Sequence, residues 1–141
     1  MIETQLSLFL VNQPGVLADV CKTLGDNSIN IRGISVSDTV DHAVVRLVVD
    51  NPKQAIHLLG EHGVLVVENE VLALDLGHTP GEMAKVARKF AQGKVNIEYA
   101  YGTADSTKAT IFFRVSDPRK AMRLLAPKRK KAKAIRKKAR R

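Results

Sequence analysis

Hydrophobic and polar positions along the first third of the chain change period twice. Apolar and polar residues alternate over residues 3–11, which predicts a β-strand. From Pro14 to about Asp26 the apolar residues recur every three or four positions, which predicts an amphipathic helix. The apolar face of this helix consists of Val16, Leu17, Val20, Cys21 and Leu24.

The pattern then predicts strands at residues 29–36 and 43–49, joined by a polar hairpin. A helix opens at Asn51-Pro52 and ends near Gly63, and residues 64–67 form a further strand. This order, βαββαβ in about 66 residues, predicts an α+β fold of the ferredoxin-like type, in which two helices cover one face of an antiparallel sheet.

The same pattern returns after an ungapped shift of 66 residues. This shift places Pro14-Gly15 on Pro80-Gly81 and Asn30-Ile31 on Asn96-Ile97. Because the register holds over two helices and several strands, the sequence indicates two copies of one module.

The second copy ends before its pattern is complete. Its helices are predicted to start at Pro80 and to cover residues 119–125, but Pro127 and a basic run follow where the fourth strand is expected. The predicted organisation is therefore a first module at residues 1–69, a second module at residues 70–127 that lacks its last strand, and a basic, disordered tail at residues 128–141.

Two features of the strands predict further association. The missing strand leaves a sheet edge that another segment or another chain must cover. Residues 43–49 and 111–113 are apolar on both faces, whereas the helices cover only one face of the sheet. The other face needs the partner module or a second chain, and we expect a homodimer or a larger oligomer.

The net charge of +9 is confined to the tail. Residues 128–141 hold ten of the 23 Lys and Arg residues and no acid, so the remaining 13 basic residues face 14 acidic ones. The tail is a candidate for sequence-independent phosphate contacts with nucleic acid or another polyanion, and the alternative is a solvated tail with incidental affinity. The candidate residues are Lys128, Arg129, Lys130, Lys131, Arg136, Lys137 and Lys138.

The remaining composition narrows the function. Apolar runs are too short to cross a bilayer and the N-terminus lacks the pattern of a signal peptide, so we expect a cytoplasmic protein without a transmembrane segment. The single Cys21 is expected to pack in the core. His57 and His62 are five residues apart without further ligands, so no metal site and no cofactor are expected. No nucleophile, base and orienting group occur together, so we expect no enzyme.

The most informative stretch is residues 12–17, where a strand runs through a Pro-Gly step into a helix. Pro14 suits the first helical position, and the N–H groups of Gly15 and its neighbours would then point out of the positive end of the helix, as a carboxylate requires. Asn12 can add a donor and an acceptor. The alternative is an ordinary strand-to-helix turn in which Asn12 bonds its own loop.

Residues 12–17, followed by Ser28-Ile29-Asn30-Ile31, resemble the signature of the ACT domain, a small regulatory module that binds amino acids. The tandem arrangement is similar to standalone tandem-ACT proteins over residues 1 to about 125. The resemblance implies a regulatory protein, without catalysis, that binds a free amino acid at an interface between modules. Nucleic-acid association through the tail is the alternative function.

The resemblance also implies which residues bind the ligand. In the first module these are Asn12, Gln13, Gly15, Val16, Leu17, Asn30 and Ile31, and in a weaker second site His78, Gly81, Glu82, Met83 and Asn96. The second site departs from the family pattern, because His78 replaces the Asn. Thr79 and Glu82 are also spaced as a capping box, whose carboxylate would compete with a ligand carboxylate.

Overall fold

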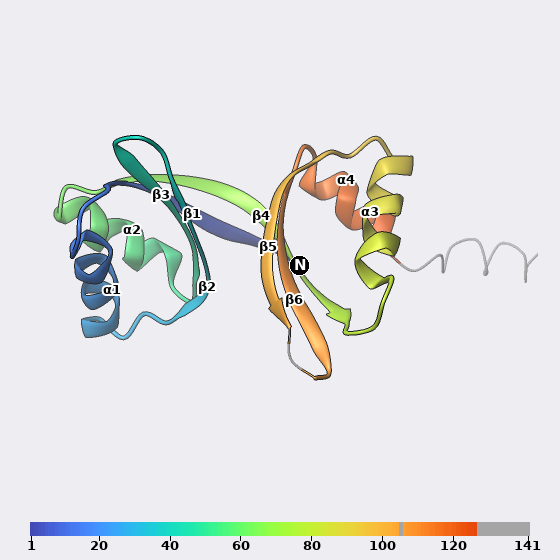
Figure 1. The fold of residues 1–141 in the computed structure, drawn as a ribbon, viewed down its shortest axis with the longest axis horizontal. Coiled ribbons are helices and arrows are strands. Elements are labelled where there is room, and N and C mark those ends of the chain that lie inside the picture. The colour runs from blue at the N-terminus through green and yellow to red at the C-terminus, as the bar shows by residue number, and fades with distance from the viewer. Residues whose placement is uncertain (105, 127–141) are drawn as a thin grey trace, which may run out of the picture.

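The computed structural model describes residues 1–104 and 106–126, and all its strands belong to one antiparallel sheet of order β2-β3-β1-β4-β6-β5 (Figure 1). The first six elements are β1 (Ile2–Val11), α1 (Val16–Asp26), β2 (Ile31–Asp38), β3 (His42–Val49), α2 (Pro52–Glu61) and β4 (Leu65–Gly77). The last four are α3 (Glu82–Gln92), β5 (Ile97–Ala104), β6 (Lys108–Val115) and α4 (Pro118–Leu125). Both predicted βαββα sequences are confirmed.

In the first module, α1 and α2 cover one face of the strands β2-β3-β1-β4. The alternation of β1 turns Leu6, Leu8 and Leu10 toward these helices, where all three are buried. From the helices, Leu24 of α1 and Leu59 of α2 reach the same core, and neither is more than 1% exposed. Cys21, predicted as a core residue, lies at the margin of this core and is half-buried.

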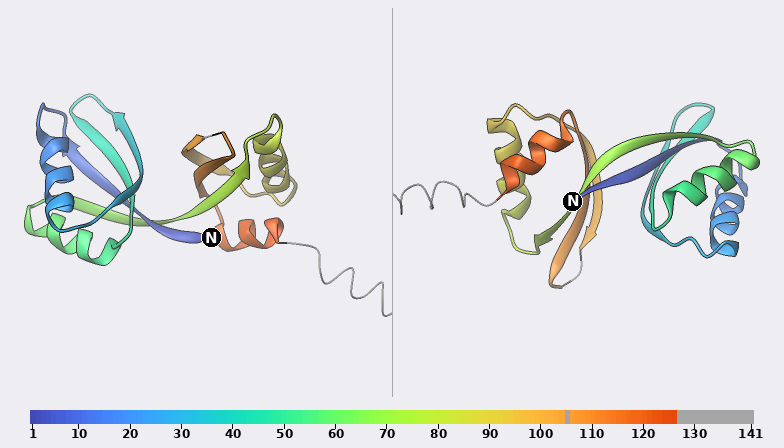
Figure 2. Two further views of the ribbon diagram at one scale, coloured as in Figure 1. Left: turned by 90° about the horizontal axis from the view of Figure 1, so that it is seen from below. Right: turned by 180° about the vertical axis from the view of Figure 1, so that it is seen from behind.

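The two modules are joined by a shared strand. β4 runs for 13 residues, where the sequence predicted two separate strands, and the predicted module boundary between residues 69 and 70 falls inside it. Residues 65–72 of β4 pair with β1, and residues 72–77 pair with β6 of the second module. One strand therefore holds both half-sheets (Figure 2).

The beginning of the chain covers the first residues of the edge left by the missing strand of the second module. Ile2 pairs with Leu72, and the N–H of Ala73 donates to the carbonyl of Met1 at 2.8 Å. The side chain of Ile2 packs against the core of the second module. The expectation that another segment or another chain must cover this edge is met in part within the chain, because β1 extends past the first module as far as Leu72 and Ala73, while β4 runs on to Gly77.

The half-sheets turn their uncovered faces toward each other. Figure 1 shows α1 and α2 on the outer side of one half and α3 and α4 on the outer side of the other. Between the halves, Val48, Val71 and Phe112 form a small buried cluster, with Ala73 and Tyr101 packed against it. The partner module thus buries part of the second apolar face of β3 and β6.

The predicted starts of α1 and α3 at Pro14 and Pro80 are wrong. The helices begin at Val16 and Glu82, after Gly15 with φ +90° and Gly81 with φ +92°. Because these left-handed glycines interrupt the helical path, each proline lies in the turn before the helix. The start of α2 is confirmed, since Asn51 caps it by accepting from the N–H of Gln54.

The predicted tail at residues 128–141, including every candidate phosphate contact, lies outside the described residues. Within the described part of the chain, no helix combines the length and apolar composition that crossing a membrane requires.

Candidate functional site

The loop between β1 and α1 of the first module is held by its backbone. The N–H of Asn12 donates to the carbonyl of Asp41 at 3.3 Å, and the N–H of Gln13 donates to the carbonyl of Val11 at 2.9 Å. Gly15 follows in the left-handed conformation, and a Cβ added there would meet no heavy atom within 4 Å. The backbone at the helix entrance is therefore fixed and open on the side of Gly15.

The N–H groups at the N-terminus of α1 have few hydrogen-bond acceptors within the described protein. No side chain caps this helix, and the N–H of Val16 makes only a long contact of 3.4 Å with the carbonyl of Gln13. The side chains of Val16 and Leu17 are half-buried and pack against the core, and their backbone N–H groups lie at the helix end. Such a helix end favours an anion, because the first N–H groups lack partners within the helix.

Asn12 is exposed beside this helix end. Within the described residues its side-chain amide makes no hydrogen bond, although the ordinary-turn interpretation required a bond to its own loop. The amide therefore offers both a donor and an acceptor next to the helix N-terminus.

The other predicted ligand residues of this module lie at the opposite end of the sheet. Asn30 exchanges hydrogen bonds with Asp50, whose side-chain oxygen accepts from the Asn30 N–H at 3.0 Å, whereas Asn12 bonds Asp41. Residues 41 and 50 flank the extended strand β3, and nine steps of about 3.3 Å separate them by roughly 30 Å. Ile31 packs against the module core. One module cannot bring Asn12 and Asn30 to the same small ligand.

The equivalent loop of the second module has the same backbone and different chemistry. Gly81 is left-handed and open like Gly15, and His78 and Met83 are exposed. The N–H of Asn96 donates to Ser116 Oγ at 2.9 Å, as that of Asn30 does to Asp50.

The predicted capping box at Thr79 does not form. The Thr79 hydroxyl donates to the carboxylate of Glu82 at 3.3 Å, and the N-cap is Gly81, without a side-chain hydrogen bond. A hydrogen bond from Lys85 lowers the pKa of the Glu82 carboxyl, which keeps it ionised. A fixed carboxylate in the first turn of α3 makes this loop a poorer place for an anion than the loop at Asn12.

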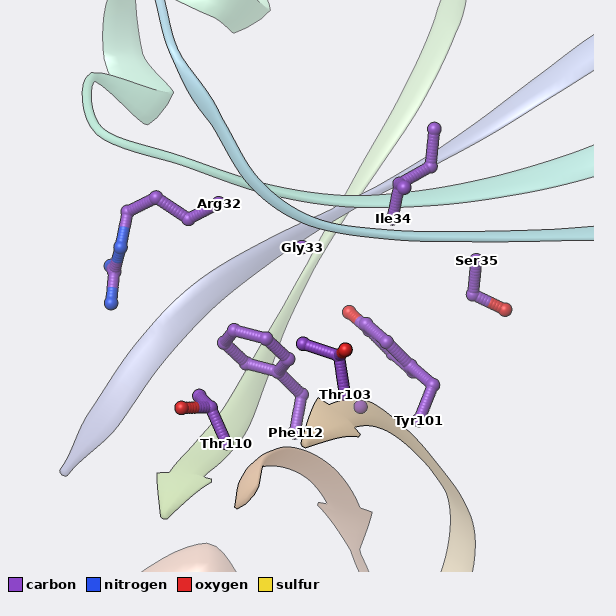
Figure 3. A pocket seen from close by; sticks show the side chains of 9 residues that line it. Arg32, Gly33, Ile34, Ser35, Tyr101, Thr103, Thr110 and Phe112 are labelled. Carbon is purple, nitrogen blue, oxygen red and sulfur yellow. The ribbon is translucent and has the colours of Figure 1, made fainter. Parts of the chain in front are cut away.

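A cleft of about 290 Å³ lies between the two modules, on the faces that the helices leave uncovered (Figure 3). It is lined by Arg32, Gly33, Ile34 and Ser35 of β2 and by Tyr101, Gly102, Thr103, Thr110 and Phe112 of β5 and β6. Figure 3 shows the side chain of Ser35 on the side of its strand that faces Tyr101, while Ile34 points away. Sequence reasoning missed this cleft, and its one signal was a glycine, Gly33, inside a predicted strand.

Buried polar contacts hold the modules together beside this cleft. Gln5 of β1 is fully buried, its amide donates to the Tyr99 hydroxyl at 2.6 Å, and its carbonyl accepts from the Tyr101 hydroxyl at 2.7 Å. Burial raises the pKa of Tyr101 well above its usual value, so that the hydroxyl stays a donor. The guanidinium of Arg46 lies 4.0 Å from the centre of the Tyr99 ring.

Comparison with known proteins agrees with this architecture. A family model described as "ACT domain pair" matches residues 1–138. Protein BT0572 from Bacteroides thetaiotaomicron has a solved structure that is 30% identical, with a TM-score of 0.85, covering 89% of this chain and 87% of that one. No curated protein matches the sequence.

Two further structures share the fold. The regulatory subunit of aspartate kinase from Thermus thermophilus, in ligand-free form, is 18% identical, with a TM-score of 0.67 over 86% of this chain and 89% of that one. The corresponding subunit from Thermus flavus is 19% identical, with a TM-score of 0.60 over 88% and 92%. Together with the match of the family model over nearly the whole sequence, these findings establish that the chain belongs to the ACT domain pair family.

Proposed function

We propose that this protein is a regulatory sensor that binds a free amino acid at the β1–α1 loop of its first module and catalyses no reaction. The observation that carries the proposal is the open N-terminus of α1 beside the unpaired amide of Asn12. The helix end suits the α-carboxylate of an amino acid, and the carbonyl oxygen of Asn12 can accept from its ammonium group. The regulatory role follows from membership of the ACT family and from the similarity to regulatory subunits of aspartate kinase.

The distance between Asn12 and Asn30 favours a site shared between two copies of the chain. β2 is a terminal strand of the sheet and exposes Ile34 and Val36, which are 45% and 51% exposed. If two copies pair antiparallel through β2, the Asn12 end of one copy approaches the Asn30 end of the other. The proposed oligomer is therefore a dimer with two equivalent ligand sites.

Calorimetric titration with the common amino acids tests the binding. Replacing Asn12 with Ala removes hydrogen bonds to charged groups of the ligand, so we expect affinity to fall roughly ten- to hundredfold. His78→Ala at the matching position of the second module is the control and should leave the affinity unchanged. If no common amino acid binds or raises the melting temperature at millimolar concentration, the proposed function is wrong.

A mixing experiment tests whether the site is shared. Asn12→Ala and Asn30→Ala each damage both sites of their own homodimer. A mixed dimer contains one site with both substitutions and one intact site. Half of the dimers in an equimolar, re-equilibrated mixture are mixed, so binding should return to about a quarter of the wild-type stoichiometry. A site formed within one chain would show no recovery on mixing. In that case light scattering of the wild-type protein should show a monomer, and calorimetry of this monomer should show the full affinity.

A further inference from the structure

The two modules dock through a pseudo-twofold arrangement whose two sides are filled differently. The 66-residue shift relates Gly33 to Tyr99 and Arg46 to Phe112. On one side, the Tyr99 ring lies against Arg46. On the other side, Gly33 faces Phe112, and a Cβ added to Gly33 would lie 2.6 Å from the ring. A large pair of side chains fills the first side, and the cleft of about 290 Å³ opens on the second.

Hydroxyl groups line the cleft on either side of two aromatic rings. Tyr101 and Phe112 stack with ring centres 5.4 Å apart, and the hydroxyls of Ser35, Thr103 and Thr110 also line the cavity (Figure 3). Thr110 donates its hydrogen to Asp75 at 2.7 Å, which fixes the orientation of its hydroxyl. A cavity of this size with a few fixed polar groups is typical of a small-molecule site.

Among the described residues that line the cleft, Arg32 is the one with a charged side chain. It occupies the irregular position between Ile31 and Gly33 in the pairing of β2 with β3, and a bulge of this kind redirects a side chain. One of its nitrogens, Nη1, donates to the carboxylate of Glu3. The side chain remains 42% exposed, so the other guanidinium nitrogens can donate to a second carboxylate.

We propose that the cleft between the modules is a second ligand site, which binds a small molecule with one carboxylate and a compact apolar body. Arg32, at one end of the cleft, holds the carboxylate, and the apolar body lies on the rings of Phe112 and Tyr101. A ligand bound there touches β2 of the first module and β5 and β6 of the second, so it stabilises the docking of the two modules.

Three molecules of one carbon skeleton test the chemistry: leucine, 4-methylpentanoate and 4-methylpentan-1-ol. The protein has two tyrosines and no tryptophan, and both Tyr99 and Tyr101 lie at the docking surface, so tyrosine fluorescence reports on this region. We expect a saturable signal with at least one of the two carboxylates and none with the alcohol. Leucine and 4-methylpentanoate separate an amino acid from a simple organic acid.

Variants locate the binding. Arg32→Gln should weaken it roughly ten- to hundredfold, because it removes the charged donor for the carboxylate. The matched control is Glu98→Gln, which removes the charge at the equivalent irregular position of the second module, where Glu98 pairs with Arg114 at 3.5 Å. Asn12→Ala should leave the fluorescence titration unchanged, which separates this site from the loop site.

Three results would overturn the proposal. The first is the absence of a signal with both carboxylates at millimolar concentration. The second is equal binding of the alcohol, and the third is equal weakening by Glu98→Gln and Arg32→Gln. Arg32 is at the surface, so its substitution leaves the core intact and the test remains valid for a folded protein.

Discussion

The two modules are copies of one pattern, yet their cores are filled by different side chains. Leu24 and Leu47 of the first module match Phe90 and Phe113 of the second, and all four are fully buried. The two phenylalanine rings meet edge to face with centres 5.8 Å apart. Within residues 1–104 and 106–126, the second module has β5, β6, its part of β4 and the end of β1, and larger side chains fill its core.

The uncovered faces differ more than the cores. Gln5 and Ser7 of the first module are buried polar residues, and their matches in the second are Val71 and Ala73. Farther along β1, Phe9 remains 41% exposed where the second module has Asp75. Two identical modules would dock symmetrically. Because matching positions carry different side chains, the docking is asymmetric: Arg46 and Tyr99 fill one side, and the cleft at Gly33 and Phe112 is open.

The largest expected loss of stability comes from replacing the matched core residues with alanine. Phe113→Ala should reduce the free energy of unfolding by about 3–5 kcal/mol and Leu47→Ala by about 2–5 kcal/mol, because each leaves a cavity in a fully buried core. Since β1 and β4 belong to both halves of the sheet, each variant should unfold in one transition in urea. Two transitions, of which only one shifts, would show that the modules are stable independently.

The buried polar contact between the modules comes next. Gln5→Val copies the residue of the second module and leaves the hydroxyls of Tyr99 and Tyr101 without their partner. We expect a loss of about 1–3 kcal/mol in urea unfolding. Tyr99→Phe together with Tyr101→Phe in the Gln5→Val background removes the unpaired groups and should recover part of this loss. No recovery would mean that the cost of Gln5→Val is one of packing.

Substitutions at the two left-handed glycines distinguish a loss of stability from a loss of amino-acid binding. Gly15→Val and Gly81→Val should each cost about 1–2 kcal/mol, because a β-branched residue is strained at a φ near +90°. Amino-acid binding should be lost in Gly15→Val and retained in Gly81→Val, as calorimetry can measure. Equal loss of binding in both variants would indicate that the second loop also binds ligand.

The smallest change in the free energy of unfolding at neutral pH is expected for Tyr101→Phe. In alkali the variant should gain stability relative to the wild type. Burial raises the pKa of Tyr101 in the folded protein. The unfolded chain therefore releases this proton first, and stability, complete below about pH 10, falls as the pH rises above that value. Urea unfolding between pH 8 and 11 should show a shallower decline for Tyr101→Phe than for the wild type. Parallel declines would assign the pH dependence to other groups.

The local pattern of apolar and polar residues predicted most of the secondary structure. The alternation in β1 and the spacing of three and four in α1 and α3 predicted these elements, because each signal is contained within about ten neighbouring residues. The helix starts were misplaced, since Pro14 and Pro80 fit a first helical position equally well on local grounds. The left-handed φ of Gly15 and Gly81 then ended the turn one residue later.

The two candidate sites also differ in whether the sequence could predict them. The loop at Asn12 could be found because its residues are contiguous and recur after 66 residues. The cleft could not, because Arg32 and Thr103 are distant in sequence and line one cavity only when the two half-sheets face each other.

The sequence by itself determined two βαββα units, the missing last strand and a neutral body with a basic tail, because periodicity and charge are properties of short segments. Only the tertiary structure decided that Met1 and Ile2 cover the start of the open edge of the second module and that β4 is one continuous strand. It also decided which uncovered faces meet around Gln5 and Gly33. Pairings of this kind join residues about 70 positions apart, and their free energy depends on the packing of the whole sheet, which no local pattern encodes.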